Sequence, residues 1–350
     1  MNTLFSTRLK QARIMHGLSM DSLCEKANNA LSKQSISKYE AGKMMPDSKS
    51  LIILANALGV TIDYFFRPLN VSIENVEFRK KSKLGVKQID SIKEVIKDKL
   101  ERYCEIESII DVKSEFKSNY RNVQILGEND IFSIVARIKN DWKLGDDGIN
   151  NLIEILEEHS IKVVEIEAPD SFDGLSGFAN GKNPIIVLNK NFDSERKRFT
   201  ALHELGHLLL NFDSSISEKE KERYCNLFAS EMLISKDVFI QKIGLNRRDI
   251  SLQELQDIQM QFGISIDALM YKAKWLNIIT DSRFKTFCIK KNQQQQFKES
   301  VEKSRYKQEQ SNRFVRLVYR ALASEIISIS KAGVLLNSPI NVVRNQLNLV

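Results

Sequence analysis

The feature that most constrains this chain is a five-residue run, His203-Glu204-Leu205-Gly206-His207. On a helix, residues four apart project from the same face about one turn apart. The imidazoles of His203 and His207 therefore lie where one tetrahedral metal ion can accept both. The chain has only four histidines, and residue frequencies give such a run by chance in fewer than about one in a hundred such chains. The run predicts a helix that carries a zinc site.

Glu204 follows the first histidine directly, so it can reach a metal-bound water without ligating the ion. Zinc lowers the pKa of such a water, and a neighbouring carboxylate can take its proton for attack on a peptide carbonyl. The run thus predicts Zn²⁺ as the cofactor and Glu204 as the catalytic base of a metallopeptidase. The alternative is an amphipathic helix with two core or surface histidines.

A catalytic zinc keeps three protein ligands and one open position, so a third ligand must come from elsewhere. A second helix is predicted at about residues 217–235. It contains four candidate carboxylates, Glu218, Glu220, Glu222 and Glu231. Glu222 lies just before the apolar face of this helix begins, and Glu231 lies near its end. The spacing alone does not separate these two.

The two segments FTALHELGHLLL and ERYCNLFASEML resemble the ImmA/IrrE family of metallopeptidases. The second motif of that family has the form Glu-x-x-Ala-Asn-x-Phe-Ala. When the chain is aligned on Asn226, Phe228 and Ala229, the zinc-binding glutamate of the family falls on Glu222. The metal ligands that the resemblance implies are His203, His207 and Glu222.

This chain departs from the family pattern at two positions. Cys225 stands where Ala is usual, and Ser235 stands where Pro commonly ends the segment. We interpret both as packing or capping variation, with Cys225 packing inward rather than serving as a soft metal ligand. The resemblance extends to residues 140–145, 172–177 and 196–200, and to the combination with an N-terminal helix-turn-helix domain.

The first 66 residues have the apolar spacing of five short helices. In the third, Ile36 and Tyr39 are spaced to be buried, while short polar and basic side chains point outward, which suits contacts in a major groove. The segment LSKQSISKYEAGKMMPDSKSLIILANALGVTIDYFF resembles the helix-turn-helix of the Xre/Cro/phage-repressor family. The DNA contacts that this resemblance implies are Lys33, Gln34, Ser35 and Lys38 on the recognition helix and Lys43 near a phosphate.

Charge is compatible with DNA binding but does not decide it. Residues 1–66 contain eight Lys/Arg and five Asp/Glu, and the formal net charge of the whole chain is +7. A solvated basic surface gives the same count. Because domains of this type also dock to proteins, DNA binding and protein docking both stay open.

Several other segments have a readable pattern. Residues 76–112 combine a basic run at 79–83 with an apolar helical stripe, interpreted as a solvated helix that packs on its neighbour or as one that carries charge near DNA. A helix is predicted at 146–159, and strands are predicted at 162–166 and 183–188. Pro184 favours a sheet edge for the second strand, where a substrate segment could add as a further strand.

The C-terminal part is expected to be helical. Residues 252–274 continue the peptidase domain, while the polar, Gln-rich residues 292–310 fit either a flexible connection or a solvated helix. Residues 314–336 are amphipathic, and residues 331–347 could form a small helix-turn-helix-like closure. This closure could serve as a docking element or as an extra core layer.

Composition narrows the class of protein. The chain is 42% hydrophobic and 28% charged, as in ordinary globular proteins. No apolar stretch approaches the ~18 residues that span a bilayer, and the start of the chain has no signal-peptide pattern. The four cysteines lie far apart without a CxxC pair, which is typical of reduced thiols. We therefore expect a cytoplasmic protein that does not bind membranes.

Together these patterns predict a mainly α fold with a small β-sheet (α+β). Four parts are expected: a five-helix helix-turn-helix domain at 1–68, a helical connector at 69–127, a zincin-like metallopeptidase domain at 128–285 and a helical region at 286–350. The resemblance implies a zinc endopeptidase that cleaves a partner repressor in a bacterial stress or mobile-element setting. The N-terminal domain is expected to bind DNA, and a homodimer is possible. The alternative is a transcriptional regulator or toxin–antitoxin component whose metal site is self-processing or non-catalytic.

Overall fold

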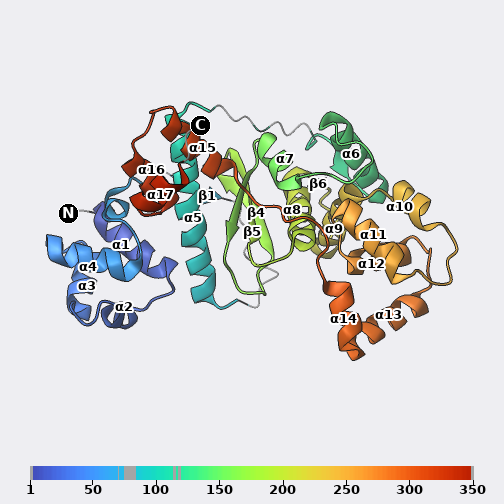
Figure 1. Cartoon of the computed structure of the whole chain (residues 1–350), viewed down its shortest axis with the longest axis horizontal. Helices are drawn as coiled ribbons and strands as arrows, with labels where there is room; N and C mark the ends of the chain where they lie inside the picture. The colour runs from blue at the N-terminus through green and yellow to red at the C-terminus, as the bar shows by residue number, and fades with distance from the viewer. Residues whose placement is uncertain (1–2, 70, 75–83, 113–115, 117–119, 348–350) are drawn as a thin grey trace. The chain divides into compact units, whose positions relative to one another are not determined.

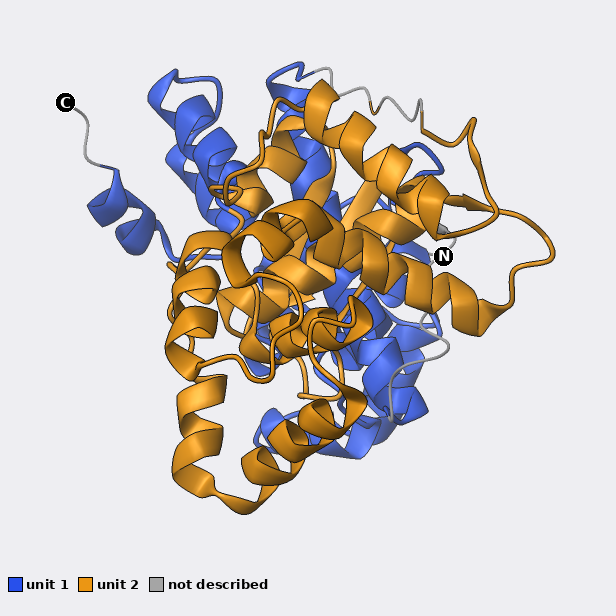
Figure 2. Cartoon of the chain, turned by 90° about the vertical axis from the view of Figure 1, so that its right-hand side faces the viewer, with its two compact units in different colours: residues 1–115, 178–183, 312–350 blue, residues 116–177, 184–311 orange. Residues whose placement is uncertain are grey.

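The computed structural model describes residues 3–69, 71–74, 84–112, 116 and 120–347. These residues form 17 α-helices and a few short strands, so the prediction of a mainly α fold with a small sheet is confirmed. The chain divides into two compact units (Figure 2): unit 1 comprises residues 1–115, 178–183 and 312–350, and unit 2 comprises residues 116–177 and 184–311. The basic run predicted at 79–83 lies outside the described residues. None of the described helices is long and apolar enough to cross a membrane.

Unit 1 begins with the bundle predicted at the N-terminus. Its elements are α1 (Thr3–Met15), α2 (Met20–Lys26), α3 (Lys33–Glu40), α4 (Ser48–Leu58) and the 3-10 helix η1 (Ile62–Phe66). The side chains of Ser19, Ser32 and Asp47 accept backbone N–H groups at the starts of α2, α3 and α4, which stabilises these short helices. Ile36 and Tyr39 of α3 are buried, as predicted. The fifth helix is a 3-10 turn.

The spine of unit 1 is the 24-residue helix α5 (Val86–Ile109). Along its length α5 packs against α1, where the Arg8 guanidinium bonds to Glu101 at 2.7 Å, both side chains being nearly inaccessible to water. Its last turns pack against the C-terminal helices through Tyr103 and Ile106 (Figure 1). These helices are α15 (Arg313–Ala323), α16 (Ile329–Leu336) and α17 (Ile340–Gln346). The short strand β1 (Ile73–Glu74) pairs antiparallel with residues 178–179.

The remaining strands are β2 (Gln124–Ile125), β3 (Lys162–Ile166), β4 (Gly174–Ala179), β5 (Asn183–Asn189) and β6 (Asn211–Phe212). They lie in unit 2, except that residues 178–179 of β4 and Asn183 of β5 belong to unit 1. β3 and β5 run parallel, with Lys162 opposite Ile185, and β4 is the other neighbour of β5. The prediction of a sheet edge at 183–188 is therefore wrong. Pro184 is tolerated in this inner strand because it precedes the first residue paired with β3.

The other elements of unit 2 are helices. They are α6 (Glu128–Asp141), α7 (Leu152–Glu158), α8 (Ser194–Leu209), α9 (Glu218–Leu233), α10 (Lys236–Ile243), α11 (Leu252–Phe262), α12 (Ile266–Trp275), α13 (Asp281–Gln293) and α14 (Gln295–Glu302). The helix predicted at 146–159 starts only at Leu152, since Asn151 adopts a left-handed conformation with φ of 52° that interrupts a helix.

Residues 303–311 form neither helix nor strand, and they are bonded firmly to the first turns of α8. The Glu195 carboxylate accepts hydrogen bonds from the Ser304 hydroxyl and from the backbone N–H groups of Arg305 and Tyr306. The fully buried Arg198 guanidinium bonds to the Glu309 carboxylate at 2.5 Å. Residues 292–310 were predicted to be a flexible connection or a solvated helix. They include the end of α13, the helix α14 and a segment that bonds to α8.

Candidate metal centre

The helix α8 carries the run His203–His207 in its second half. His203 is 5% exposed and Glu204 is 7% exposed, whereas His207 is half-buried. The neighbouring apolar side chains of the helix, Ala201, Leu202, Leu205 and Leu208, are buried in the core of unit 2. This packing fixes the helix face on which both imidazoles project.

The following helix, α9, brings Glu222 to the two histidines. It begins with a capping box in which Ser217 and Glu220 bond to each other's backbone N–H groups. A Cβ atom on Gly206 would lie 3.3 Å from the Cys225 Sγ and 3.4 Å from the Cys225 Cα. Because glycine has no Cβ, α8 and α9 can approach closely at this point. The glycine of the histidine run therefore helps to set the position of the third carboxylate.

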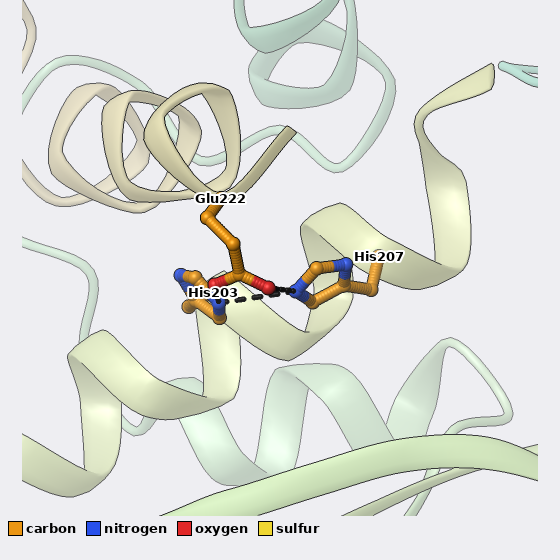
Figure 3. Close-up of side chains that lie close together, drawn as sticks. All are labelled: His203, His207 and Glu222. Atoms are coloured by element: carbon orange, nitrogen blue, oxygen red, sulfur yellow. Dashed lines mark hydrogen bonds and ion pairs between the residues drawn. The ribbon is translucent and has the colours of Figure 1, made fainter. Parts of the chain in front are cut away.

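Three ligand atoms from the two helices converge. The Nε2 atoms of His203 and His207 are 3.1 Å apart, and each is 3.4 Å from an oxygen of the Glu222 carboxylate. Figure 3 shows the two rings and the carboxylate pointing toward one another. Tetrahedral zinc with bond lengths of roughly 2.1 Å holds its ligand atoms roughly 3.4 Å apart. The donor set and its spacing therefore fit a zinc ion.

Two consecutive residues of α9 contact the Nδ1 atoms of the two imidazole rings, on the side away from Glu222. The Nδ1 of His203 lies 2.8 Å from the Asn226 Oδ1, and the Nδ1 of His207 lies 3.6 Å from the Cys225 Sγ. An amide oxygen only accepts hydrogen bonds, so the proton of His203 resides on Nδ1 and the Nε2 lone pair faces the other ligands. Cys225 is fully buried and contacts the rear nitrogen of His207.

Glu204 is oriented by the strand β4. The Ser176 hydroxyl donates a hydrogen bond of 2.8 Å to the Glu204 Oε2. A Cβ on Gly174 would lie 2.7 Å from both the Thr200 side chain and the Val187 carbonyl oxygen. The strand can lie this close to α8 only because residue 174 has no side chain. One carboxylate oxygen of Glu204 is thus occupied by Ser176.

The exposure of the ligands differs across the centre. The side chains of His207 and Glu222 are 30% and 33% exposed, whereas His203 is buried. The centre is therefore open to solvent on the side of His207 and Glu222. A catalytic zinc site differs from a structural one in keeping such an open position.

Glu231, the other candidate for a third ligand, lies in a different environment. Its carboxylate forms a buried ion pair with Lys272 and accepts a hydrogen bond of 2.9 Å from the backbone N–H of Lys236. Among the described residues, the group of potential metal ligands comprises His203, His207 and Glu222. Ser235 caps α10 by accepting the backbone N–H of Val238.

The residues predicted to contact DNA lie on or just after α3. Gln34, Lys38 and Lys43 are exposed. Lys33 is also exposed and forms an ion pair of 2.8 Å with Asp21. Ser35 is half-buried, and its hydroxyl bonds to that of Ser32 at the start of the helix. Four of the five side chains therefore face water, and Ser35 belongs to the helix cap.

Neither Ser176 nor Asn226 was predicted from sequence as a residue of the centre, and Asn226 served only as an anchor of the family alignment. Asn226 lies four residues after Glu222, so a shared helix face was a usable signal. Ser176 precedes Glu204 by 28 residues, and no local pattern connects them. The fold and the centre together define a metallopeptidase-like domain in a chain that also has a helix-turn-helix bundle.

Comparison with known proteins agrees with this class. Residues 156–274 match the family described as IrrE N-terminal-like domain, and residues 9–65 match the family described as Helix-turn-helix. The chain therefore carries a helix-turn-helix domain followed by an IrrE N-terminal-like domain, which confirms the resemblance seen in the sequence. The SPbeta prophage-derived uncharacterized HTH-type transcriptional regulator YonR of Bacillus subtilis (strain 168) is 36% identical over 64 residues. The match covers 18% of this chain and 57% of that regulator.

Proposed function

We propose that this chain is a zinc-dependent endopeptidase that binds DNA through its N-terminal domain and cleaves a partner repressor or regulator. The observation that carries the enzymatic part is the convergence of His203, His207 and Glu222 at the spacing of zinc ligands. Glu204 lies beside this centre and is held by Ser176. A structural metal site would have no need of such a carboxylate.

A zinc ion bound there would supply a Lewis acid and lower the pKa of water. Glu204 takes the proton of the attacking water and returns it to the leaving amine. Because Ser176 occupies Oε2, this proton transfer falls to Oε1. Asn226 and Cys225 keep the rear nitrogens of both rings occupied, so the front nitrogens stay in place throughout.

The substrate class rests on the domain pairing. A helix-turn-helix domain beside a peptidase-like domain would bring the protease to a DNA-bound protein, and a repressor is such a protein. The similar prophage protein is described as a transcriptional regulator. Docking of a substrate strand on residues 185–188 is not retained, because β5 has a neighbour on each side.

DNA binding rests on the exposed face of α3. Gln34 and Lys38 present an amide and an ammonium group to the solvent, as base-edge and phosphate contacts require. Lys33 and Asp21 form an ion pair, and their side chains are 60% and 64% exposed, respectively. Such exposed pairs contribute little to stability, so Lys33 can exchange Asp21 for a phosphate.

The enzymatic proposal is tested by Glu204→Gln in the zinc-loaded chain. The substrate is the regulator encoded next to this chain, and cleavage is followed by gel and mass spectrometry. Loss of a general base lowers rates roughly 10²–10⁴-fold, while the zinc content should remain that of the wild type. The exposed Glu158 of α7 provides a matched control, and Glu158→Gln should cleave normally. Cleavage by Glu204→Gln at the wild-type rate would refute the assignment.

A further inference from the structure

The C-terminal helices α15–α17 belong to the same compact unit as the N-terminal helix-turn-helix domain. They are fastened to α5 by side-chain contacts: Arg313 bonds to Glu107 at 2.6 Å, Lys331 pairs with Glu105, and Arg102 donates a hydrogen bond to the Leu335 carbonyl. The N-terminal bundle is fastened to the same helix by the ion pair between Arg8 and Glu101. Both ends of the described chain are therefore anchored on α5.

These C-terminal helices are strongly basic. Residues 312–347 contain five basic side chains, Arg313, Arg316, Arg320, Lys331 and Arg344. Their single acidic residue is Glu325, so their net charge of +4 exceeds the +3 of residues 1–66. Two of the cations point at carboxylates of α5. The side chains of Arg316, Arg320 and Arg344 are exposed.

The exposed arginines have the arrangement that phosphate contact requires. Arg316 and Arg320 are four residues apart on α15, so they share a helix face. The guanidinium group presents a planar fork of donors that matches phosphate oxygens. Among the described residues, Arg320 and Arg344 have no carboxylate within ion-pair distance. Their charge is therefore available to an external anion.

Helices α16 and α17 also have the outline of a helix-turn-helix. A turn of three residues, 337–339, joins them, and its first residue, Asn337, is left-handed with φ of 50°. A short turn of this kind joins the two helices of DNA-binding motifs. Val343 is the buried residue of α17. The exposed polar side chains of this helix are Asn341, Arg344, Asn345 and Gln346, which are of the types that contact bases and phosphates.

We infer that α15–α17 form a second duplex-DNA contact, in which Arg316, Arg320 and Arg344 bind backbone phosphates. This inference rests on the proposed function, because it extends a DNA-binding unit whose first contact is α3. When both contacts engage one duplex, the second binds at a high effective concentration. The DNA footprint of the protein is then larger than that of the matched N-terminal domain.

A competing occupant is a protein partner, because Ile340 and Val342 of α17 are 42% and 38% exposed. Apolar side chains of this kind would pack against a protein surface but add little to phosphate binding. The salt dependence of DNA binding separates the two, because only ionic contacts with phosphates release counterions.

The experiment measures binding of the full chain to a labelled, mixed-sequence DNA duplex by fluorescence anisotropy over a series of salt concentrations. Each phosphate contact contributes a slope of about −0.9 to a plot of log affinity against log salt. The triple variant Arg316→Ala, Arg320→Ala, Arg344→Ala should lower the steepness of this slope by about 2 to 3. An unchanged slope would overturn the inference and would favour a protein partner for the exposed surface of α17.

A matched control removes the same charge from exposed positions of unit 2. Arg248→Ala, Lys285→Ala and Lys298→Ala together should leave the slope as in the wild type. An equal loss in this control would show that net charge alone is responsible, which would also overturn the inference. If the wild-type chain does not bind the duplex at all, both this inference and the DNA-binding part of the proposed function fail. If it binds and the triple variant is unaffected, only this inference fails.

Discussion

Replacing Asn226 with alanine tests whether its hydrogen bond to the His203 ring contributes to the affinity of the centre for zinc. Asn226 Oδ1 lies 2.8 Å from the Nδ1 of the buried His203. Without this acceptor, the proton of the ring can move to Nε2, the atom that faces Glu222 and the Nε2 of His207. The ring then has to change its tautomer before it can ligate a metal. Loss of such a supporting hydrogen bond typically lowers metal affinity about 10–100-fold, or about 1.4–2.8 kcal/mol.

The neighbouring Cys225 provides an internal comparison. Its Sγ lies 3.6 Å from the Nδ1 of His207, and sulfur is a weak hydrogen-bond acceptor. Cys225→Ala should therefore lower zinc affinity by less than Asn226→Ala, by at most about tenfold. Cys225→Ser places a stronger acceptor at the same position and should not weaken binding. Asn226→Asp keeps the acceptor and adds a negative charge, so its affinity should equal or exceed that of the wild type.

Zinc affinity is measured by competition with a chromophoric chelator on the purified apo chain. The matched control is Asn292→Ala, which makes the same chemical change at an exposed position of α13. Circular dichroism and thermal melts of each apo variant verify that the fold is retained. If folded Asn226→Ala binds zinc as tightly as the wild type, the reasoning on ring orientation is refuted. A loss in Asn226→Ala that Asn226→Asp does not restore would point to packing instead.

Two further predictions concern Glu204 and the spine of unit 1. Ser176→Ala removes the hydrogen bond to Glu204. It should lower kcat for peptide cleavage about tenfold or more without changing the affinity for zinc. An unchanged kcat would contradict the role of Ser176 in positioning Glu204. Burial tends to raise the pKa of Asp98, but Arg102 and Arg67 outweigh it and hold the pKa below its usual value. This carboxylate therefore stabilises the fold above the unfolded-state pKa of about 3.9, and the contribution is lost as the pH falls through the lower folded-state pKa. Asp98→Asn should lower Tm at neutral pH and flatten the fall of Tm in acid; melts with the same acid dependence as the wild type would contradict this.

The elements that the sequence predicted well are those whose signal is local. The strand β3 covers the predicted residues 162–166, and α9 (Glu218–Leu233) lies within the helix predicted at 217–235. The apolar stripe from residue 89 to 106 lies within α5. In each case, side chains a few positions apart along the chain determine the periodicity. Packing against distant parts of the chain does not alter such a pattern.

The wrong predictions have a common physical origin. Pro184 favours a sheet edge in isolation, but β5 has a neighbour on each side, and its pairing with β3 starts only at Ile185. The strand β4 was not predicted, because its glycines and Ser176 give no strand periodicity. Its position depends on the absence of a side chain at Gly174, opposite Thr200 and Val187. Contacts between residues so far apart along the chain leave no local pattern.

The metal centre shows where sequence spacing stops being sufficient. His203 and His207 could be paired from sequence because one turn of a helix fixes their separation. Choosing between Glu222 and Glu231 required the family resemblance, and the structure offers a physical reason for the same choice. Ligation by Glu231 would have to break its ion pair with Lys272, whose side chain is 2% exposed. Leaving a buried charge without its partner costs about 3–5 kcal/mol. Lys272 lies 41 residues after Glu231, so this argument becomes available only once the fold is known.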